Sequence, residues 1–344
     1  MGKVRFGIIG MGIGRSHARA VAKDPRGELA ALCDLDATRM ESLATELHQT
    51  PRLYTSTAGL AADREVDAVF VGTPNQLHVP VALEMLRAGK HVLCTKPLSD
   101  SEEAARELVS AAEASSLVNM MSLTMRYSPA TQYLGGLSRS GELGEIYYAR
   151  ARSVRRSGIP SWGAHFVRQG GGAFRDMGVH VLDSSWWLAG CPEPVSVLGT
   201  AGARFGPRGV GYTGFSPVPE SYAAQYQSDD YGCALVRFAN GAAIQVESHW
   251  ASHQPDEVQI ELFGTTGGAR LKPLTLYRTI QGRPADLAIG EPKGDGCENV
   301  IAHFIACILD GVSCQSPLRH GLVVQQMLEA VLVSAGRGEE VRLR

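Results

Sequence analysis

Short apolar runs alternate with amphipathic segments along the first third of the chain. Runs at 4–10, 28–34, 66–72, 91–94 and 117–121 have the length and composition of buried strands. Segments at 14–22, 36–47, 79–89 and 101–114 have helical spacing and end signals, with Asp36 in an N-cap position. This alternation predicts a parallel, doubly wound α/β sheet.

Beyond residue 125 the pattern changes to longer strands that cluster together. We expect a strand at 144–156, a helix at 173–189, and helices with one apolar face at 297–311 and 321–338. Two strands at 229–251 are expected around a type I′ turn at Asn240-Gly241, followed by a hairpin at 256–271. These features indicate an α+β domain, so we predict a dinucleotide-binding domain at 1–124 and an α+β domain at 125–344.

Composition narrows the function classes. The net charge is −2 and Lys and Arg are not clustered, so neither nucleic acid nor an anionic membrane is an expected partner. No apolar run reaches membrane-spanning length, and the N-terminal run is too short for a signal segment. The seven cysteines contain no C-x-x-C pair, which favours reduced thiols in a cytoplasmic protein and predicts no metal site.

The first strand ends in GMGIG (10–14), directly before a helix. Glycines there let a pyrophosphate approach the backbone, and the helix start stabilises its charge. The usual G-x-G-x-x-G would have glycine at 15, where this chain has Arg15, so an ordinary strand–helix turn is the alternative. Asp34 ends the second strand, at the position where a carboxylate binds the adenosine ribose in dinucleotide-binding folds. A carboxylate there favours NAD over NADP, and the nearby Arg39 would reduce that preference.

Two further segments follow strands, GTPNQLH (72–78) and CTKPL (94–98). The first is explained equally well by a turn and a helix cap. In the second, proline holds Lys96 in an extended conformation, although a surface lysine is the alternative. The residues expected to bind the cofactor are Gly10, Gly12, Ile13, Gly14, Arg15, Asp34, Arg39, Thr73, Pro74, Asn75, His78 and Lys96.

The segment GGGAFRDMGVHVLD (170–183) carries an acid and a histidine four residues apart. On a helix, Asp176 and His180 share one face, and Gly172 leaves room for a ligand near the helix start. The alternative is a capping role for Asp176 and a packing role for His180.

These segments, in this order, resemble the Gfo/Idh/MocA oxidoreductase family over essentially the whole chain. The family's Glu-Lys-Pro is Thr95-Lys96-Pro97 here, and the glycine loop is shortened. The resemblance implies a Rossmann domain followed by an α+β domain with an open, mostly antiparallel sheet. The exposed face of that sheet commonly builds homodimers or homotetramers.

The resemblance also implies the catalytic residues. It places Asp176 and His180 over the nicotinamide beside Lys96, with His180 as base and Lys96 stabilising the developing alkoxide. Asp176 would position the substrate, and His249-Trp250 and Asp183 would lie nearby. The substrate-binding set is Lys96, Arg126, Trp162, His165, Asp176 and His180. A salt bridge at the domain junction is the alternative for Arg126, and loop packing for Trp162.

We therefore expect an NAD-dependent dehydrogenase that acts on a secondary hydroxyl of a sugar, cyclitol or glycoside. One alternative is an NAD-dependent glycosidase that oxidises a ring hydroxyl, eliminates the neighbouring group and reduces the ketone again. It needs one more base, for which Asp183, His165 and Tyr127 are candidates. The other alternative is a regulator that binds NAD without catalysis.

Overall fold

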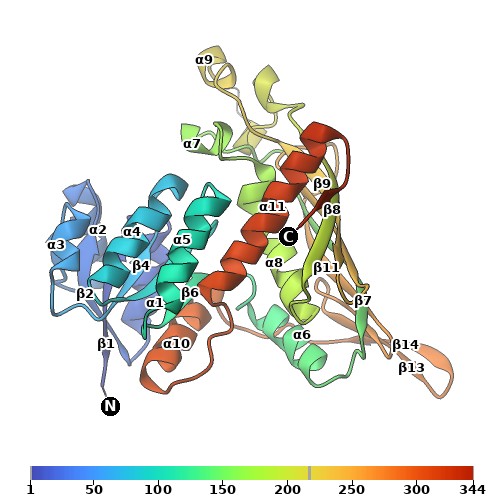
Figure 1. The fold of residues 1–344 in the computed structure, drawn as a ribbon, viewed down its shortest axis with the longest axis horizontal. Coiled ribbons are helices and arrows are strands. Elements are labelled where there is room, and N and C mark those ends of the chain that lie inside the picture. Colours follow the sequence, from blue (N-terminus) through green and yellow to red (C-terminus); the bar gives the residue numbers. More distant parts are fainter. Residues whose placement is uncertain (1, 216–217, 344) are drawn as a thin grey trace. The chain divides into compact units, whose positions relative to one another are not determined.

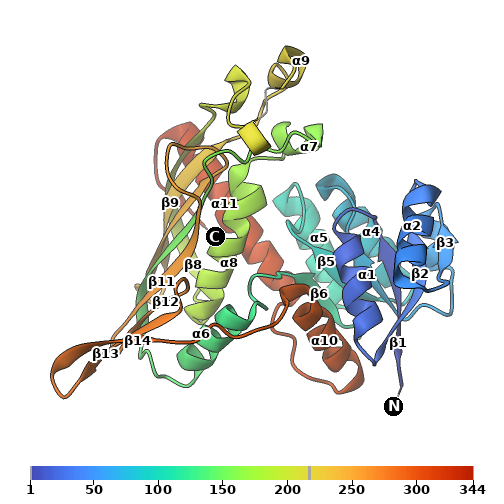
Figure 2. The same cartoon turned by 180° about the vertical axis from the view of Figure 1, so that it is seen from behind.

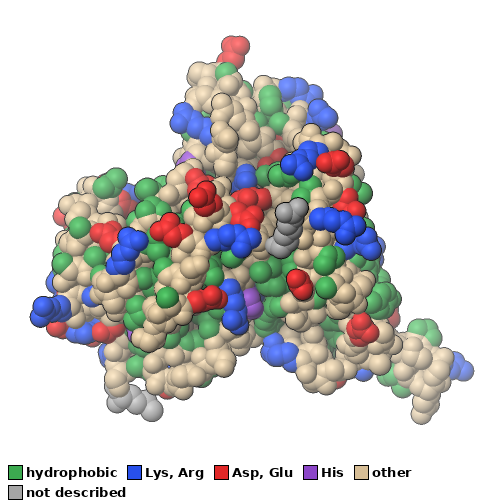
Figure 3. All heavy atoms as spheres, in the orientation of Figure 1, with side chains coloured by type: hydrophobic (Ala, Val, Ile, Leu, Met, Phe, Trp, Pro, Cys, Tyr) green, Lys and Arg blue, Asp and Glu red, His purple; other side chains and the backbone are tan. Residues whose placement is uncertain are grey.

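The computed structural model describes residues 2–215 and 218–343 (Figures 1 and 2). The chain divides into two compact units, Met1–Tyr127 with Gly294–Gln325 and Ser128–Lys293 with Gln326–Arg344. The last helix thus begins in the first unit and ends in the second. Among the described residues, no helix has the length and apolar character that crossing a membrane requires. On the face drawn in Figure 3, basic and acidic side chains are interspersed.

The first unit is built on a six-stranded parallel sheet in the order β3-β2-β1-β4-β5-β6. Its strands are β1 Val4–Ile9, β2 Gly27–Cys33, β3 Arg52–Tyr54, β4 Ala68–Val71, β5 His91–Thr95 and β6 Asn119–Ser122. Its helices are α1 Gly14–Lys23, α2 Ala37–Leu47, α3 Thr57–Ala61, α4 Asn75–Arg87, α5 Glu102–Glu113 and α10 Gly296–Leu309. This confirms the predicted doubly wound sheet, whose strand order reverses between β1 and β4.

Both faces of this sheet are covered. Phe6 and Ile8 of β1 are buried in a cluster with α1, α2 and α10, and the rings of Phe6 and Phe304 lie 6.1 Å apart. Ile9 is buried in the cluster on the opposite face, with α4 and α5. Strand side chains alternate between faces, so a strand buried on both sides needs an unbroken apolar run, which β1 has after Arg5.

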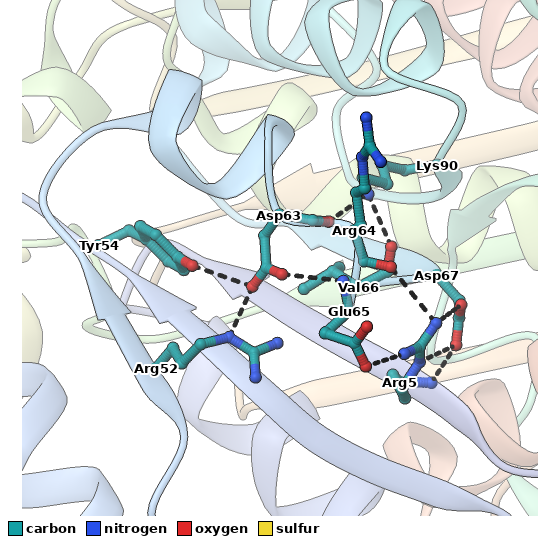
Figure 4. A network of polar contacts seen from close by, with 9 residues as sticks. All are labelled: Arg5, Arg52, Tyr54, Asp63, Arg64, Glu65, Val66, Asp67 and Lys90. Carbon is teal, nitrogen blue, oxygen red and sulfur yellow. Dashed lines mark hydrogen bonds and ion pairs between the residues drawn. The ribbon is translucent and has the colours of Figure 1, made fainter.

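A polar network holds the edge of this sheet at which β1, β4 and β5 begin (Figure 4). Arg5 donates to Asp67 at 2.9 and 2.7 Å and also pairs with Glu65. The ammonium of Lys90 donates to the carbonyls of Asp63 and Val66 at 2.5 and 2.8 Å. Arg5 and Lys90 both have partners within the network, and ligands of such sheets bind at the opposite edge, so we interpret this network as structural.

The second unit contains a nine-stranded sheet in the order β14-β13-β12-β11-β7-β10-β9-β8-β15. Only β7 and β10 pair in parallel, which confirms the open, mostly antiparallel sheet. Its strands are β7 Ile146–Val154, β8 Pro194–Gly202, β9 Tyr231–Phe238, β10 Ala243–His249, β11 Glu257–Gly264, β12 Gly268–Arg270, β13 Thr275–Ile280, β14 Arg283–Ala288 and β15 Val341–Arg342. Its helical segments are α6 Pro129–Arg139, α7 Ala164–Val167, η1 Phe174–Gly178, α8 Val179–Leu188, η2 Gly206–Arg208, η3 Thr213–Phe215 and α9 Glu220–Ala223; α11 Leu318–Arg337 ends here.

Helix α8 packs on β7, β10 and β11, and α6 packs on α8, so these helices lie on one face of the sheet (Figures 1 and 2). The turn between β9 and β10 differs from the prediction. Phe238 N donates to Ala242 O, and only Gly241, at φ +86°, has a positive φ, whereas a type I′ turn also requires one at Asn240. The connection is a three-residue loop with glycine in the left-handed position, and the I′ prediction was wrong.

Candidate functional site

The glycine loop lies where the strand order of the first unit reverses. Gly10 has φ +88°, and a Cβ there would overlap the carbonyl of Gly72, the residue after β4. Gly14 packs closely, with an added Cβ 2.9 Å from Ile8, whereas a Cβ on Gly12 would meet nothing within 4 Å. No side chain caps the start of α1 at Ile13. The loop therefore leaves an open, uncapped helix start, as a pyrophosphate site requires.

Asp34 lies against this loop. Its Oδ2 accepts a hydrogen bond of 2.6 Å from Met11 N, and its Oδ1 accepts one of 3.1 Å from Asp36 N. Arg39 lies 3.5 Å away, whereas the guanidinium of Arg15 is paired with Glu46 on α2 at 2.8 Å. The carboxylate is thus held beside the glycines.

The segments after β4 and β5 are joined by one imidazole. His78 contacts the carbonyl of Thr73 through Nε2 and that of Pro97 through Nδ1, both at 2.7 Å. Burial lowers the pKa of His78, although the two carbonyls favour the charged ring. The ring thereby sets the spacing between the carbonyls of Thr73 and Pro97. Lys96, which precedes Pro97, is half-buried, and the peptide bond between them is cis.

The hydroxyl of Thr73 provides a test of whether these residues fit a dinucleotide. Its Oγ1 is buried and has no hydrogen-bond partner among the described residues. A buried hydroxyl without a partner is costly, so such groups commonly face a ligand. Pro74 and Asn75 follow at the start of α4. The orphan hydroxyl, the uncapped helix and Asp34 together fit a dinucleotide that crosses the β1/β4 reversal.

The segment with Asp176 and His180 lies in the second unit and is not a uniform α-helix. Phe174–Gly178 forms a π-helical turn, and the α-helix begins only at Val179. Its start is fixed by Asp229, whose Oδ2 accepts from Phe174 N at 2.8 Å. Gly172 has φ +114°, and a Cβ there would overlap the Asp229 carboxylate. Burial raises the pKa of Asp229 to about 6.

Asp176 is oriented by Trp250, the residue that directly follows β10. The indole Nε1 of Trp250, which is fully buried, donates to Asp176 Oδ2 at 3.0 Å. Partial burial lowers the pKa of His165, and the negative charge of Asp176 acts on this pKa in the opposite direction. Short π-helical turns are frequent at functional sites, where they turn a side chain off the regular helix face.

The remaining predicted residues of this unit differ in exposure. His180 is half-buried, and Asp183 is 1% exposed. Trp162 is 65% exposed and lies edge-on to Phe166, with ring centroids 6.1 Å apart. Trp162 therefore contacts its own loop and also presents most of its surface to solvent.

Arg126 and Tyr127 lie at the end of the first unit's first segment. Arg126 is fully buried and donates to Gln315 O at 2.6 Å and to His320 Nδ1 at 3.1 Å. Tyr127 is 2% exposed, its hydroxyl is bonded to Ser316 at 2.8 Å, and burial raises its pKa. A phenol held in the core in this way is unsuited to act as a base, so Tyr127 is removed from the candidates.

Sequence reasoning missed Asp229 and Asp230, which follow each other directly before β9. The carboxylate of Asp230 accepts hydrogen bonds from the backbone of Arg204, Phe205 and Gly206 at 2.7 to 2.9 Å. Two adjacent acids before an apolar strand are the only signal that could have identified them, because their partners lie far away in sequence.

The structure therefore assembles one group of predicted residues within each unit, considered separately. The first joins the glycine loop, Asp34, Thr73 and the Lys96 segment at the carboxyl edge, where the parallel strands end. The second joins Asp176, Trp250 and His165, with His180 four residues further along. Such groups can bind a dinucleotide and exchange a proton with a hydroxyl.

Known proteins are similar to this chain in both units. Residues 4–123 match the family profile described as "Oxidoreductase family, NAD-binding Rossmann fold", and residues 131–270 match that of the GFO/IDH/MocA C-terminal domain. D-glucoside 3-dehydrogenase of Escherichia coli is 29% identical over 348 residues, which span 99% of this chain and 97% of that protein. Inositol 2-dehydrogenase of Rhizobium meliloti is 25% identical, with 99% of each chain covered. The solved structure of levoglucosan dehydrogenase in complex with NADH and L-sorbose has a TM-score of 0.86, with 22% identity and 100% of both chains covered, and shares the fold.

Proposed function

The chain belongs to the Gfo/Idh/MocA family of NAD-binding oxidoreductases, and we propose that it oxidises a secondary hydroxyl of a sugar, cyclitol or glycoside with NAD. The two relatives described above are, by name, dehydrogenases of a D-glucoside and of inositol. Of the three substrate classes, a glycoside has the most support, because the D-glucoside 3-dehydrogenase matches at the higher identity.

One observation carries the proposal. The imidazole of His78 ties the peptide after Lys96 to Thr73, whose buried hydroxyl has no partner among the described residues. A lysine and a buried hydroxyl that no described residue satisfies therefore lie at the carboxyl edge that also holds the glycine loop. In a sheet of this strand order, that edge is where a dinucleotide binds.

In alcohol oxidation, each of these side chains has a separate role. NAD, when bound, supplies the hydride acceptor. His180 takes the proton from the substrate hydroxyl, since an imidazole titrates near neutral pH. Lys96 donates a hydrogen bond to the same oxygen and stabilises the negative charge that develops there.

Asp176 orients the substrate. One of its oxygens is held by Trp250, and a carboxylate has further lone pairs that can accept from sugar hydroxyls. The charge of Asp176 also favours a protonated His180, which stabilises the state formed after proton transfer.

A substrate screen tests the proposal. The protein is mixed with NAD or NADP and with methyl glucosides, inositols or free hexoses, and reduced nicotinamide is followed by its absorbance. Net oxidation produces reduced cofactor together with a ketone product. Release of the aglycone without net reduction of NAD would instead identify a glycosidase. Binding of NAD without turnover of any substrate class would contradict the proposal.

The open sheet supports assembly into a homodimer or homotetramer. Leu198 of β8 and Leu235 of β9 are cross-strand neighbours and are 53% and 39% exposed. Exposed apolar pairs of this kind favour burial against another surface. Light scattering after size exclusion should give a mass of two or four chains. The free thiols of all seven cysteines also support a reducing, cytoplasmic location.

A further inference from the structure

Three side chains of the first unit form a cluster that the proposed reaction does not use. His303 and Cys307 are four residues apart on α10, and Cys314 lies on the segment that leaves this helix. Their ligand atoms all lie within 4.8 Å of one another, and Cys307 Sγ is 3.5 Å from His303 Nε2. In a tetrahedral zinc site, bond lengths of about 2.3 Å to sulfur and 2.0 Å to nitrogen separate these two atoms by about 3.5 Å.

The hydrogen bonding of the histidine also suits a metal. The backbone N–H of Gln315 donates to His303 Nε2 at 3.0 Å, so this nitrogen presents a lone pair on the side of the cluster. A metal ion binds such a lone pair and displaces the proton of a thiol when it binds sulfur.

We propose that Cys307, Cys314 and His303 bind one zinc ion in the first unit. Two thiolates neutralise its charge, which makes the ion compatible with a largely buried site, and soft sulfur ligands select zinc over magnesium or calcium. The fourth position is taken by water or by the carbonyl of Asn119, which is 3.9 Å from Cys314 Sγ. Cys314 is only partly buried and gives the ion an entry path.

The chemistry of binding is an exchange of protons for the ion. Cys314 and any protonated Cys307 lose their protons to solvent, two sulfur–zinc bonds form, and the nitrogen–zinc bond replaces the hydrogen bond from Gln315 N. The carbonyl of Gln315 accepts from Arg126, so a single residue, Gln315, connects the site with Arg126. Because zinc replaces protons on the thiols, the affinity for zinc rises with pH.

Zinc titration of the full chain tests the site. The protein is reduced, freed of metal with a chelator, and titrated with zinc chloride in competition with a chromophoric zinc indicator. We expect one zinc per chain with a Kd below about 1 μM. Cys307→Ser, Cys314→Ser and His303→Ala should each weaken binding by about 100-fold, whereas Cys297→Ser, on the same helix, should leave it unchanged.

Cobalt gives an independent readout that does not depend on activity. Substitution with Co²⁺ should produce sulfur-to-cobalt charge-transfer absorption that decreases in each single Cys variant and disappears when both are replaced. Circular dichroism of the variants checks that they are folded. Absence of stoichiometric zinc binding, or binding unaffected in the Cys307/Cys314 double variant, would overturn the proposal.

Discussion

The indole nitrogen of Trp250 donates a hydrogen bond of 3.0 Å to the carboxylate of Asp176. Trp250 directly follows β10, and Asp176 lies in the π-helical turn before α8. A rigid, fully buried donor thus fixes one oxygen of the acid that we assign to the substrate.

Replacement of Trp250 by Phe removes this donor and keeps an aromatic ring in the core. Since the carboxylate then loses its orientation, we expect kcat to fall by about tenfold with little change in the KM for NAD. The matched control is Trp186→Phe, because the Trp186 indole donates to the carbonyl of Pro192 at 2.8 Å instead. Equal losses of activity in the two variants would mean that Trp250 acts only through packing.

Asp34 should determine the choice of cofactor. Asp34→Ser removes the carboxylate that we propose to bind the ribose, so we expect the Kd of NAD to rise by about tenfold and the preference for NAD over NADP to shrink. Asp36→Ser is the control, because Asp36 caps α2 through Thr38 N and serine can replace that cap. Isothermal titration with both cofactors measures the effect, and an unchanged ratio of affinities in Asp34→Ser would contradict it.

Gly172→Ala should disrupt the π-helical turn. The added methyl group overlaps the Asp229 carboxylate at a φ of +114°, and we expect a loss of about 3 kcal/mol in the free energy of unfolding. Gly190→Ala separates the steric overlap from the backbone strain. Gly190 also has a positive φ, +88°, but its added Cβ meets nothing within 4 Å. We expect about 1 kcal/mol there by urea denaturation. A loss in Gly172→Ala no larger than in Gly190→Ala would show that the Asp229 contact tolerates the methyl group.

Stability should decline in mild acid because of His17. Its ring stacks on Phe70 at 3.7 Å and contacts Ser122 at 2.7 Å, and burial lowers its pKa from 6.5 to about 4. The unfolded chain therefore binds one more proton between these pH values, so stability falls as pH decreases from 6.5 to 4, by about 3 kcal/mol for this group.

His17→Gln should flatten the dependence of the unfolding free energy on pH in that window. His48→Asn is the control, since His48 is exposed and has φ +52°, a conformation that asparagine tolerates. The comparison must be made between variants, because Asp229, whose pKa is raised to about 6, stabilises the fold in the opposite direction as pH falls. An identical pH dependence in wild type and His17→Gln would contradict the assignment.

Local sequence was sufficient to predict the strands and helices that an apolar run or a capping residue defines. β1 is an unbroken apolar run after Arg5, and Asp36 caps α2 through Thr38 N as predicted. β3 has three residues and none is buried, so no apolar run indicated it. The periodicity of 297–311 indicated a helix but carried no information that α10 returns to the first sheet.

From the sequence, site residues could be predicted only where they belong to a recognisable motif. The glycine loop and Asp34 lie together as the spacing implied, but the π-helical turn depends on Asp229 and Trp250, which are more than fifty residues away along the chain. Arg126 was expected to line the substrate site. Its partners, Gln315 and His320, come from a segment almost two hundred residues later, which no local pattern could indicate.

The most direct measurement of the central claim is a comparison of His180→Ala with wild type, using NAD and a methyl glucoside or another substrate found in the screen. Turnover and cofactor affinity are measured on the same protein. The account predicts that kcat falls by about 10²–10⁴-fold while the Kd of NAD changes by less than about twofold. Retained turnover in His180→Ala, or loss of NAD binding together with turnover, would contradict it.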